Sequence, residues 1–143
     1  MPRMKRDVAV LVDTGPLVAI IDKGQAEHEL GVETAREIRC PLLTVWPVIT
    51  EALYLLSFSS RGQDALWEMI VGQALRIADL SREDAPRLRQ LMHRYADLPM
   101  DLADAALVHV AERENLRTIF TLDREDFRID VPSHIRAFRL LPP

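Results

Sequence analysis

Apolar residues along the chain form short runs separated by longer amphipathic segments. Residues 8–12 (VAVLV) are apolar on both faces, which is typical of a central strand in a parallel sheet. Four further short runs predict strands at residues 41–45, 75–80, 117–122 and 137–141. Helical patterns lie between them, over residues 16–23, 26–38, 47–56, 61–74, 81–97 and 101–115. This alternation predicts a three-layer α/β/α fold with a mainly parallel central sheet.

Cap residues refine several of these helix boundaries. Pro16 suits a first helical turn, and Gly24 suits the end of the same helix. Thr44 is expected to cap the helix of residues 47–56, with Pro47 tolerated in its first turn. Ser81, followed by an acid three residues later, is expected to open the helix of residues 81–97.

Length and composition indicate an ordinary globular protein. The chain has 143 residues, 48% of them hydrophobic and 28% charged, and we expect residues 1–143 to form one domain. The single cysteine, Cys40, suits a reducing cytosol. The first apolar run is bracketed by Asp7 and Asp13 and lacks a cleavage pattern, so we expect a cytoplasmic protein without a membrane anchor.

Net charge gives little information about a nucleic-acid partner. The formal charge is −4 at pH 7, which does not indicate a polyanion binder. A cluster of site carboxylates can nevertheless hide a basic rim in such a total.

Asp13 is a carboxylate near the middle of the apolar stretch VAVLVDTGPLVAII. It follows the first predicted strand, and ligands of open parallel sheets bind beyond the carboxyl ends of the strands. The structural alternative is an Asx-turn, in which the carboxylate accepts hydrogen bonds from the backbone of Thr14 and Gly15.

Glu51 lies inside the apolar helix segment PVITEALYLL. Its neighbours three and four positions away are apolar or aromatic, so no helix-surface ion pair is available to it. A glutamate on such a helix, next to the carboxyl edge of a sheet, is better interpreted as a ligand than as a surface residue.

Two further pairs of acids begin helices or follow strands. Asp101 and Asp104 lie three residues apart, a spacing that also fits a helix cap with a second acid in the first turn. Asp104 is poorly explained by capping if the apolar remainder of its helix is buried. Asp123 follows the strand of residues 117–122, and Asp126 could serve as a turn residue.

Taken together, these acids converge on one edge of the predicted sheet. Two carboxylates at about 4 Å and an effective dielectric near 20 repel each other by about 4 kcal/mol, so such a cluster requires a cation. No His or Cys accompanies the acids. Oxygen-only ligation points to Mg²⁺ or Mn²⁺ rather than to zinc.

The order and spacing of four motifs give the chain a family resemblance. VLVDTGPLVA, VITEAL, DLADAALVHVAE and TLDREDF resemble the motifs of PIN domains, in particular VapC-type toxins of bacterial and archaeal toxin–antitoxin pairs. The resemblance implies an α/β/α domain that cleaves RNA with a divalent metal, leaving a 5′-phosphate and a 3′-hydroxyl. It also implies a homodimer that is bound and silenced by a small antitoxin protein.

The same resemblance assigns roles to individual positions. The acidic quartet of the family is matched by Asp13, Glu51, Asp104 and Asp123. The possible accessory residues are Thr14, Thr121, Asp101 and Asp126. Metal-held water would attack the RNA phosphodiester, with Glu51 holding metal or orienting that water.

Basic and aromatic side chains could add RNA contacts. Arg124 and Arg128 flank the acid after the fourth strand and could contact phosphate. Surface helices carry four further arginines, Arg61, Arg87, Arg89 and Arg94. For Arg87 and Arg89 we favour a solvated helix face. Base stacking is possible for the aromatics, but core or dimer packing is favoured for Trp46, Tyr54, Trp67 and Tyr95.

Three other classes of function fit the sequence less well. An aspartic protease would need a second D-T-G and a β-rich fold, and neither is present. A phosphatase that uses Asp13 as nucleophile would want an acid at position 15, which is Gly15. A non-catalytic PIN-like scaffold that binds RNA or protein would be expected to have lost some of the acids. We therefore favour the nuclease and keep the scaffold and the phosphatase as alternatives.

Overall fold

A five-stranded parallel sheet forms the centre of the computed structural model, which describes residues 7–94 and 100–143. The strands are β1 (Val10–Val12), β2 (Leu42–Thr44), β3 (Leu75–Ile77), β4 (Thr118–Phe120) and β5 (Arg139–Leu141). Their spatial order is β3-β2-β1-β4-β5, and every neighbouring pair is parallel. All five predicted strands are confirmed, although each is shorter than its apolar run.

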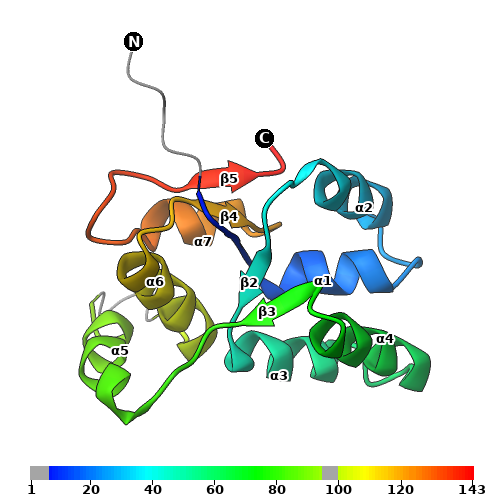
Figure 1. Cartoon of the computed structure of the whole chain (residues 1–143), viewed down its shortest axis with the longest axis horizontal. Coiled ribbons are helices and arrows are strands. Elements are labelled where there is room, and N and C mark those ends of the chain that lie inside the picture. Colours follow the sequence, from blue (N-terminus) through cyan, green and yellow to red (C-terminus); the bar gives the residue numbers. More distant parts are fainter. Residues whose placement is uncertain (1–6, 95–99) are drawn as a thin grey trace.

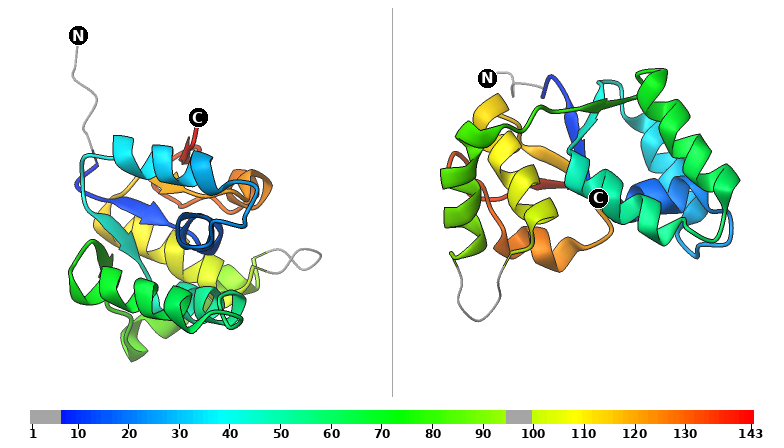
Figure 2. Two further views of the ribbon diagram at one scale, coloured as in Figure 1. Left: turned by 90° about the vertical axis from the view of Figure 1, so that its right-hand side faces the viewer. Right: turned by 90° about the horizontal axis from the view of Figure 1, so that it is seen from below.

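Seven α-helices are assigned within the described residues, and they cover both sides of the sheet (Figures 1 and 2). They are α1 (Thr14–Ile21), α2 (His28–Glu37), α3 (Trp46–Leu55), α4 (Ser60–Val71), α5 (Ala85–Met92), α6 (Leu102–Glu114) and α7 (Arg124–Ile129). Helices α1 to α4 gather at one end of the molecule and α5 to α7 at the other. The predicted three-layer α/β/α architecture is therefore confirmed.

The core lies between the sheet and helices α1, α3 and α6. Strand β1 is buried along its whole length, and α6 is buried on most sides between Ala105 and Ala111. Phe127 of α7 is also buried and packs edge-on against Phe138, with ring centroids 5.9 Å apart. A helix segment that is apolar on most sides must be covered on most sides, and α6 packs against α3 and α5.

Three local predictions need correction or comment. Thr44 does not cap α3: it ends β2, and its buried hydroxyl donates to the carbonyl of Val12 at 2.8 Å, whereas Val45 is the N-cap residue. Pro47 lies in the first turn of α3, as predicted. Ser81 forms the predicted capping box, but it opens the 3₁₀ turn η1 (Arg82–Asp84), which leads into α5.

Other helix boundaries also differ from the sequence pattern. Helix α1 ends at Ile21 with Asp22 as its C-cap residue, before the predicted stop at Gly24. Helix α5 ends at Met92, and residues 95–97 of the longer predicted helix lie outside the described residues. Helix α7 was not predicted at all. In the described part of the chain, no helix is both long enough and apolar enough to cross a membrane.

Candidate functional site

The predicted acidic quartet comes from four different elements at the carboxyl edge of the sheet. Asp13 directly follows β1, and Asp123 lies just beyond β4. Glu51 lies on α3, the helix that follows β2, and Asp104 lies in the first turn of α6. Parallel strands end at one common edge, so the topology brings these side chains to the same side of the molecule.

Thr121 links the two strand-end acids. Its hydroxyl donates to Asp13 Oδ2 at 3.0 Å and accepts the backbone N–H of Asp123 at 2.9 Å. Thr121 and Asp13 are both buried, and the Asp13 residue is only 8% exposed. The hydroxyl therefore fixes the orientation of one carboxylate and the backbone position of the other.

Thr14 makes the corresponding contact on the α3 side of the site. Its hydroxyl donates to Glu51 Oε2 at 2.9 Å, joining residues 37 positions apart. Glu51 is partly buried and receives this bond from the first residue of α1. The two predicted accessory threonines thus each donate a hydrogen bond to one carboxylate of the quartet.

Burial and like charges raise the pKa of Asp13. Burial is the largest cause, and the charges of Glu51 and Asp123 add to it, so the pKa rises to about 6. The Thr14 backbone amide and the Thr121 hydroxyl offset part of the rise. Asp13 is the N-cap residue of α1 but makes no side-chain capping hydrogen bond, so the Asx-turn alternative does not account for this carboxylate.

The pKa of Asp104 is raised further than that of Asp13. Burial raises its pKa first, and the nearby carboxylates Asp101, Asp13, Asp126 and Asp130 raise it further, to about 8. Asp101 caps α6 by accepting the Asp104 backbone N–H at 2.8 Å, so its predicted capping role is confirmed. The charge of Asp104, three residues further, interacts with that of Asp13.

Helix α7 brings two more acids to the cluster. Asp123 caps this helix and accepts the backbone N–H of Asp126 at 3.2 Å. Burial, the hydrogen bond with Asp123 and the charges of Asp123 and Asp101 raise the pKa of Asp126 to about 6. Asp126 therefore belongs to the cluster and is not a turn residue.

Asp130 is a member of the cluster that sequence reasoning missed. It ends α7 and is only 6% exposed. Burial, followed by the charges of Asp126 and Asp101, raises its pKa to about 6, although Arg94 lowers it in part. Its spacing of four residues from Asp126 would have indicated a shared helix face, had a helix been predicted there.

The donor set matches a hard divalent cation in kind. It consists of carboxylate oxygens, which suit Mg²⁺ or Mn²⁺. In four of these carboxyl groups, burial and the charges of neighbouring carboxylates raise the pKa. As the side chains lie, no group of three or more His, Cys, Asp or Glu residues within 7–94 and 100–143 has the geometry of a complete metal site.

The arginines predicted to contact RNA differ in their surroundings. Arg124 donates to the backbone carbonyl of Pro142, so part of its hydrogen-bonding capacity is used within the fold. Arg128 is exposed on α7. Arg87 forms an ion pair with Glu112, so its role is a contact within the fold rather than the predicted solvated helix face or a phosphate contact. Arg94 donates to the carbonyl of Val131 at 2.9 Å.

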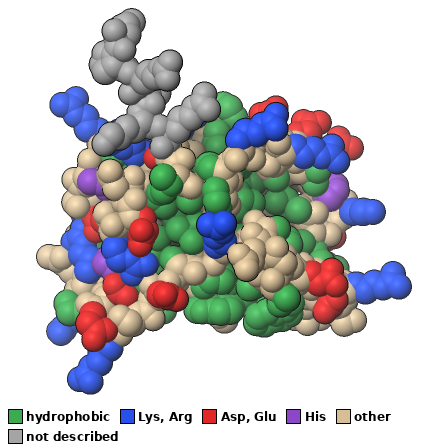
Figure 3. Space-filling model, in the orientation of Figure 1, with side chains coloured by type: hydrophobic (Ala, Val, Ile, Leu, Met, Phe, Trp, Pro, Cys, Tyr) green, Lys and Arg blue, Asp and Glu red, His purple; other side chains and the backbone are tan. Residues whose placement is uncertain are grey.

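The aromatic residues of α3 and α4 are exposed. Of the two roles favoured for them, core packing is therefore wrong for these residues, and dimer packing stays a prediction. Trp46 and Trp67 contact each other with ring centroids 6.1 Å apart, yet both are exposed. Tyr54 and Phe58 are 77% and 69% exposed. Figure 3 shows hydrophobic side chains at the surface over this part of the molecule. Tyr95 lies outside the described residues.

Comparison with known proteins gives consistent similarities. A family model described as PIN domain matches residues 10–131. The ribonuclease VapC26 of Mycobacterium tuberculosis (strain ATCC 25618 / H37Rv) is 28% identical over 136 residues, which cover 93% of this chain and all of that protein.

Two solved structures share the fold at lower identity. VapC20 of M. tuberculosis, described as a sarcin-ricin loop cleaving toxin, has a TM-score of 0.71 and 17% identity, over 77% of this chain and 86% of its own. VapBC2 of Rickettsia felis, bound to a DNA fragment from its promoter, has a TM-score of 0.61 and 19% identity, over 92% of this chain and 96% of its own.

Proposed function

This chain belongs to the PIN-domain family, and from that premise we propose that it is a metal-dependent endoribonuclease, the toxin of a toxin–antitoxin pair. The observation that carries the proposal is the cluster of mutually repelling carboxyl groups at the carboxyl edge of the sheet. Such a cluster destabilises the fold unless a cation neutralises it. The similarity to proteins named as ribonuclease and as RNA-loop-cleaving toxin supports the choice of RNA as substrate.

The quartet supplies the groups that the reaction needs. Asp13, Asp104 and Asp123 would hold Mg²⁺ or Mn²⁺, and Glu51 would hold metal or orient the attacking water. Thr121 keeps Asp13 and Asp123 in place, and Thr14 does so for Glu51. A bound divalent cation stabilises negative charge at the phosphoryl group and lowers the pKa of water. We expect products with a 5′-phosphate and a 3′-hydroxyl.

Supporting residues surround the quartet. Asp101 and Asp126 raise the negative charge of the site, and Asp101 also caps α6. Arg128, exposed on the same helix as Asp126, is the better placed of the two predicted phosphate contacts, because Arg124 is bound to Pro142. Phosphate contacts of this kind position RNA without selecting its sequence.

The exposed apolar face of α3 and α4 supports association with protein. Its exposed members are Trp46, Tyr54, Leu55, Phe58, Trp67 and Val71. Contiguous apolar surface on a small protein commonly marks an interaction site. We propose that the protein is a cytoplasmic, single-domain homodimer that binds a small antitoxin, and the VapBC2 neighbour supports the antitoxin as a partner class.

The test of the nuclease is cleavage of a synthetic RNA stem-loop by the purified protein. Cleavage should require Mg²⁺ or Mn²⁺ and stop with EDTA, and Asp13→Asn should abolish it. Asp64→Asn, which alters an exposed carboxylate on α4, is the matched control and should cut normally.

Each other outcome would contradict a defined part of the proposal. Undiminished cleavage in EDTA would exclude the metal mechanism. RNA binding without cleavage would favour the scaffold, and Asp13-dependent hydrolysis of a phosphate monoester without RNA cleavage would favour the phosphatase. Expression alone should arrest growth, and co-expression of a neighbouring small gene should relieve the arrest; normal growth would argue against the toxin.

A further inference from the structure

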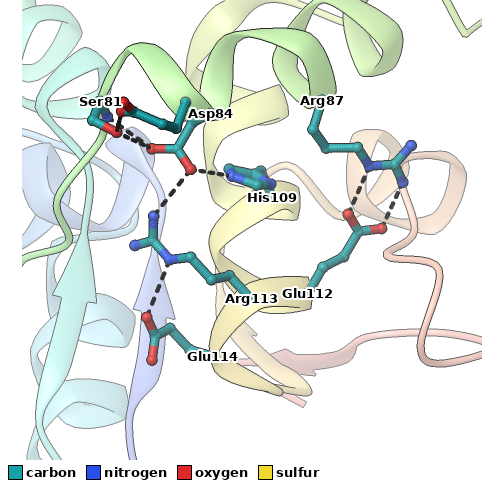
Figure 4. Close-up of polar contacts among 8 residues, drawn as sticks. Ser81, Asp84, Arg87, His109, Glu112, Arg113 and Glu114 are labelled. Carbon is teal, nitrogen blue, oxygen red and sulfur yellow. Dashed lines mark hydrogen bonds and ion pairs between the residues drawn. The ribbon is translucent and has the colours of Figure 1, made fainter.

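Two separate polar links join the segment formed by η1 and α5 to α6 (Figure 4). In the first, Asp84 Oδ1 lies 2.7 Å from His109 Nε2 and accepts a bond from Arg113 at 3.3 Å. In the second, Arg87 donates through Nε and Nη2 to the two carboxylate oxygens of Glu112, at 2.8 and 2.7 Å. Both links dock the same pair of helices.

The second link, unlike the first, reaches the loop that follows α7. Glu112 Oε2 also accepts the backbone N–H of Ser133 at 2.7 Å. On the other side of the same loop, Arg94 donates to the carbonyl of Val131 at 2.9 Å. The loop of residues 131–133 is therefore attached to α6 through Glu112 and to the end of α5 through Arg94.

The charge state of Glu112 suits this role. Burial by itself would raise its pKa, but the hydrogen bonds from Arg87 and Ser133 outweigh burial and lower the pKa to about 2. The group is thus ionised at neutral pH. A planar two-point contact with arginine holds the carboxylate in one orientation, which leaves Oε2 directed at the loop.

The attached loop follows directly from the acidic cluster. Asp130 immediately precedes Val131, and Asp126 lies one helical turn earlier on α7. A helix of six residues is not stable by itself, so tertiary contacts decide where α7 lies. The buried Phe127 fixes its middle, and the loop fixes its end.

We propose that Glu112, held by Arg87, is a positioning residue of the nuclease site. Through the Ser133 amide it fixes the end of α7 and so sets where Asp126 and Asp130 stand against Asp101 and Asp104. This inference rests on the proposed function, because it assigns these acids to a cation site. Metal-site partners one step removed from the ligands typically change affinity or activity by about 10- to 100-fold.

The first link provides the matched control. Asp84, the N-cap residue of α5, joins this helix to α6, but none of its contacts within residues 7–94 and 100–143 reaches residues 130–134. Asp84→Asn and Glu112→Gln are equivalent changes of charge on the same helix interface. Both should lower the melting temperature, and only Glu112→Gln should affect the acidic cluster.

The experiment compares the two variants in three measurements on the full chain. Calorimetric titration with Mn²⁺ should show about 10-fold weaker binding for Glu112→Gln and wild-type binding for Asp84→Asn. The kcat for RNA cleavage should fall with Glu112→Gln while KM is unchanged. Amide hydrogen exchange of residues 126–134 in metal-free protein should quicken only in Glu112→Gln.

A second pair of variants separates positioning from loss of fold. Arg87→Met leaves Glu112 without its two-point partner and should weaken Mn²⁺ binding, whereas Arg87→Lys keeps one charged contact and should restore part of it. Equal losses in Glu112→Gln and Asp84→Asn would overturn the proposal, because any loosening of α5 on α6 would then suffice. Unchanged exchange and unchanged Mn²⁺ affinity in Glu112→Gln would also overturn it.

Failure of the proposed function would be visible separately. A wild-type protein that cuts no RNA contradicts the nuclease assignment, and the Mn²⁺ titration and the exchange comparison still decide the role of Glu112. If the wild type also binds no Mn²⁺, the exchange of residues 126–134 decides it.

Discussion

Replacing Asp104 by Asn should stabilise the metal-free protein and abolish RNA cleavage. The carboxylate is largely buried and lies near four other acids, which is why its pKa rises from 3.8 to about 8. An amide of the same shape carries no charge to repel them. It also offers no anionic oxygen to a metal ion, so gain of stability and loss of activity should occur together.

The magnitude follows from the pKa shift. Roughly four pKa units at 1.36 kcal/mol each set a ceiling of roughly 5–6 kcal/mol on the penalty for ionising Asp104 in the folded protein. The side chain is not fully buried, so solvent screening reduces this figure, and we expect about 1–3 kcal/mol at pH 8. For a domain of this size that corresponds to a rise in Tm of roughly 3–9 °C.

The pH dependence has a defined sign. The folded-state pKa of Asp104 is above the unfolded value, so the group stabilises the fold fully below about pH 4, and this contribution is lost as pH rises towards 8. The Asn variant has no such titration. Its advantage in Tm over wild type should therefore be largest at pH 8 and should vanish near pH 4.

Thermal unfolding in EDTA at pH 5 and pH 8 tests this, with Asp64→Asn as the control that should change neither value. Added Mg²⁺ should then raise the Tm of wild type at pH 8 and leave Asp104→Asn unaffected. An Asp104→Asn variant that is less stable than wild type in EDTA at pH 8 would refute the electrostatic reasoning. A variant that is more stable but still cleaves RNA would refute its role as a metal ligand.

Other substitutions test separate parts of the site and surface. Asp101→Ala should destabilise the fold by about 0.5–2 kcal/mol in denaturant unfolding through loss of the α6 cap, whereas Asp101→Asn should keep the cap and most of the cleavage. Arg128→Ala should raise KM for RNA and reduce the slope of log affinity against log salt by about one phosphate contact. The depressed pKa of Glu112 stabilises the fold above about pH 4 and is lost as pH falls towards 2, so Glu112→Gln should flatten the acid limb of the Tm profile. Phe58→Ser should lower the apparent mass in sedimentation if the α3–α4 face joins two copies.

The sequence predicted those parts of the fold that depend on pattern and topology. Short apolar runs that alternate with helical patterns indicate strands of a covered sheet, and the acids that follow two of them are then expected at one edge. The positions of Asp13 and Asp123 follow from this rule alone. Thr44 could not be placed in the same way, because a threonine hydroxyl satisfies a helix cap or a neighbouring strand carbonyl equally well. The Thr44 hydroxyl bonds to the carbonyl of Val12, and because Val12 is distant in sequence this partner could not be predicted locally.

The end of α7 was beyond local prediction for a different reason. DREDFRID has too few residues to show a helical period, and its acids are equally common in turns. The helix exists because Phe127 is buried and the following loop is held by Glu112 and Arg94. Asp130 consequently lies in the cluster because of contacts between residues that are distant in sequence, and local sequence patterns cannot predict such contacts.

Helix α6 makes the same point about function. It carries Asp104 in its first turn and Glu112 near its end, and the pKa of Asp104 is raised whereas the pKa of Glu112 is lowered. Glu112 receives its compensation from within the chain, because Arg87 and the Ser133 amide bind it. The pKa of Asp104 is raised first by burial, and the charged groups that raise it further are other carboxylates. A carboxylate that the fold itself neutralises serves structure, whereas one placed among like charges requires a cation from solution, and this difference is the physical basis for assigning Asp104 to the reaction and Glu112 to its support.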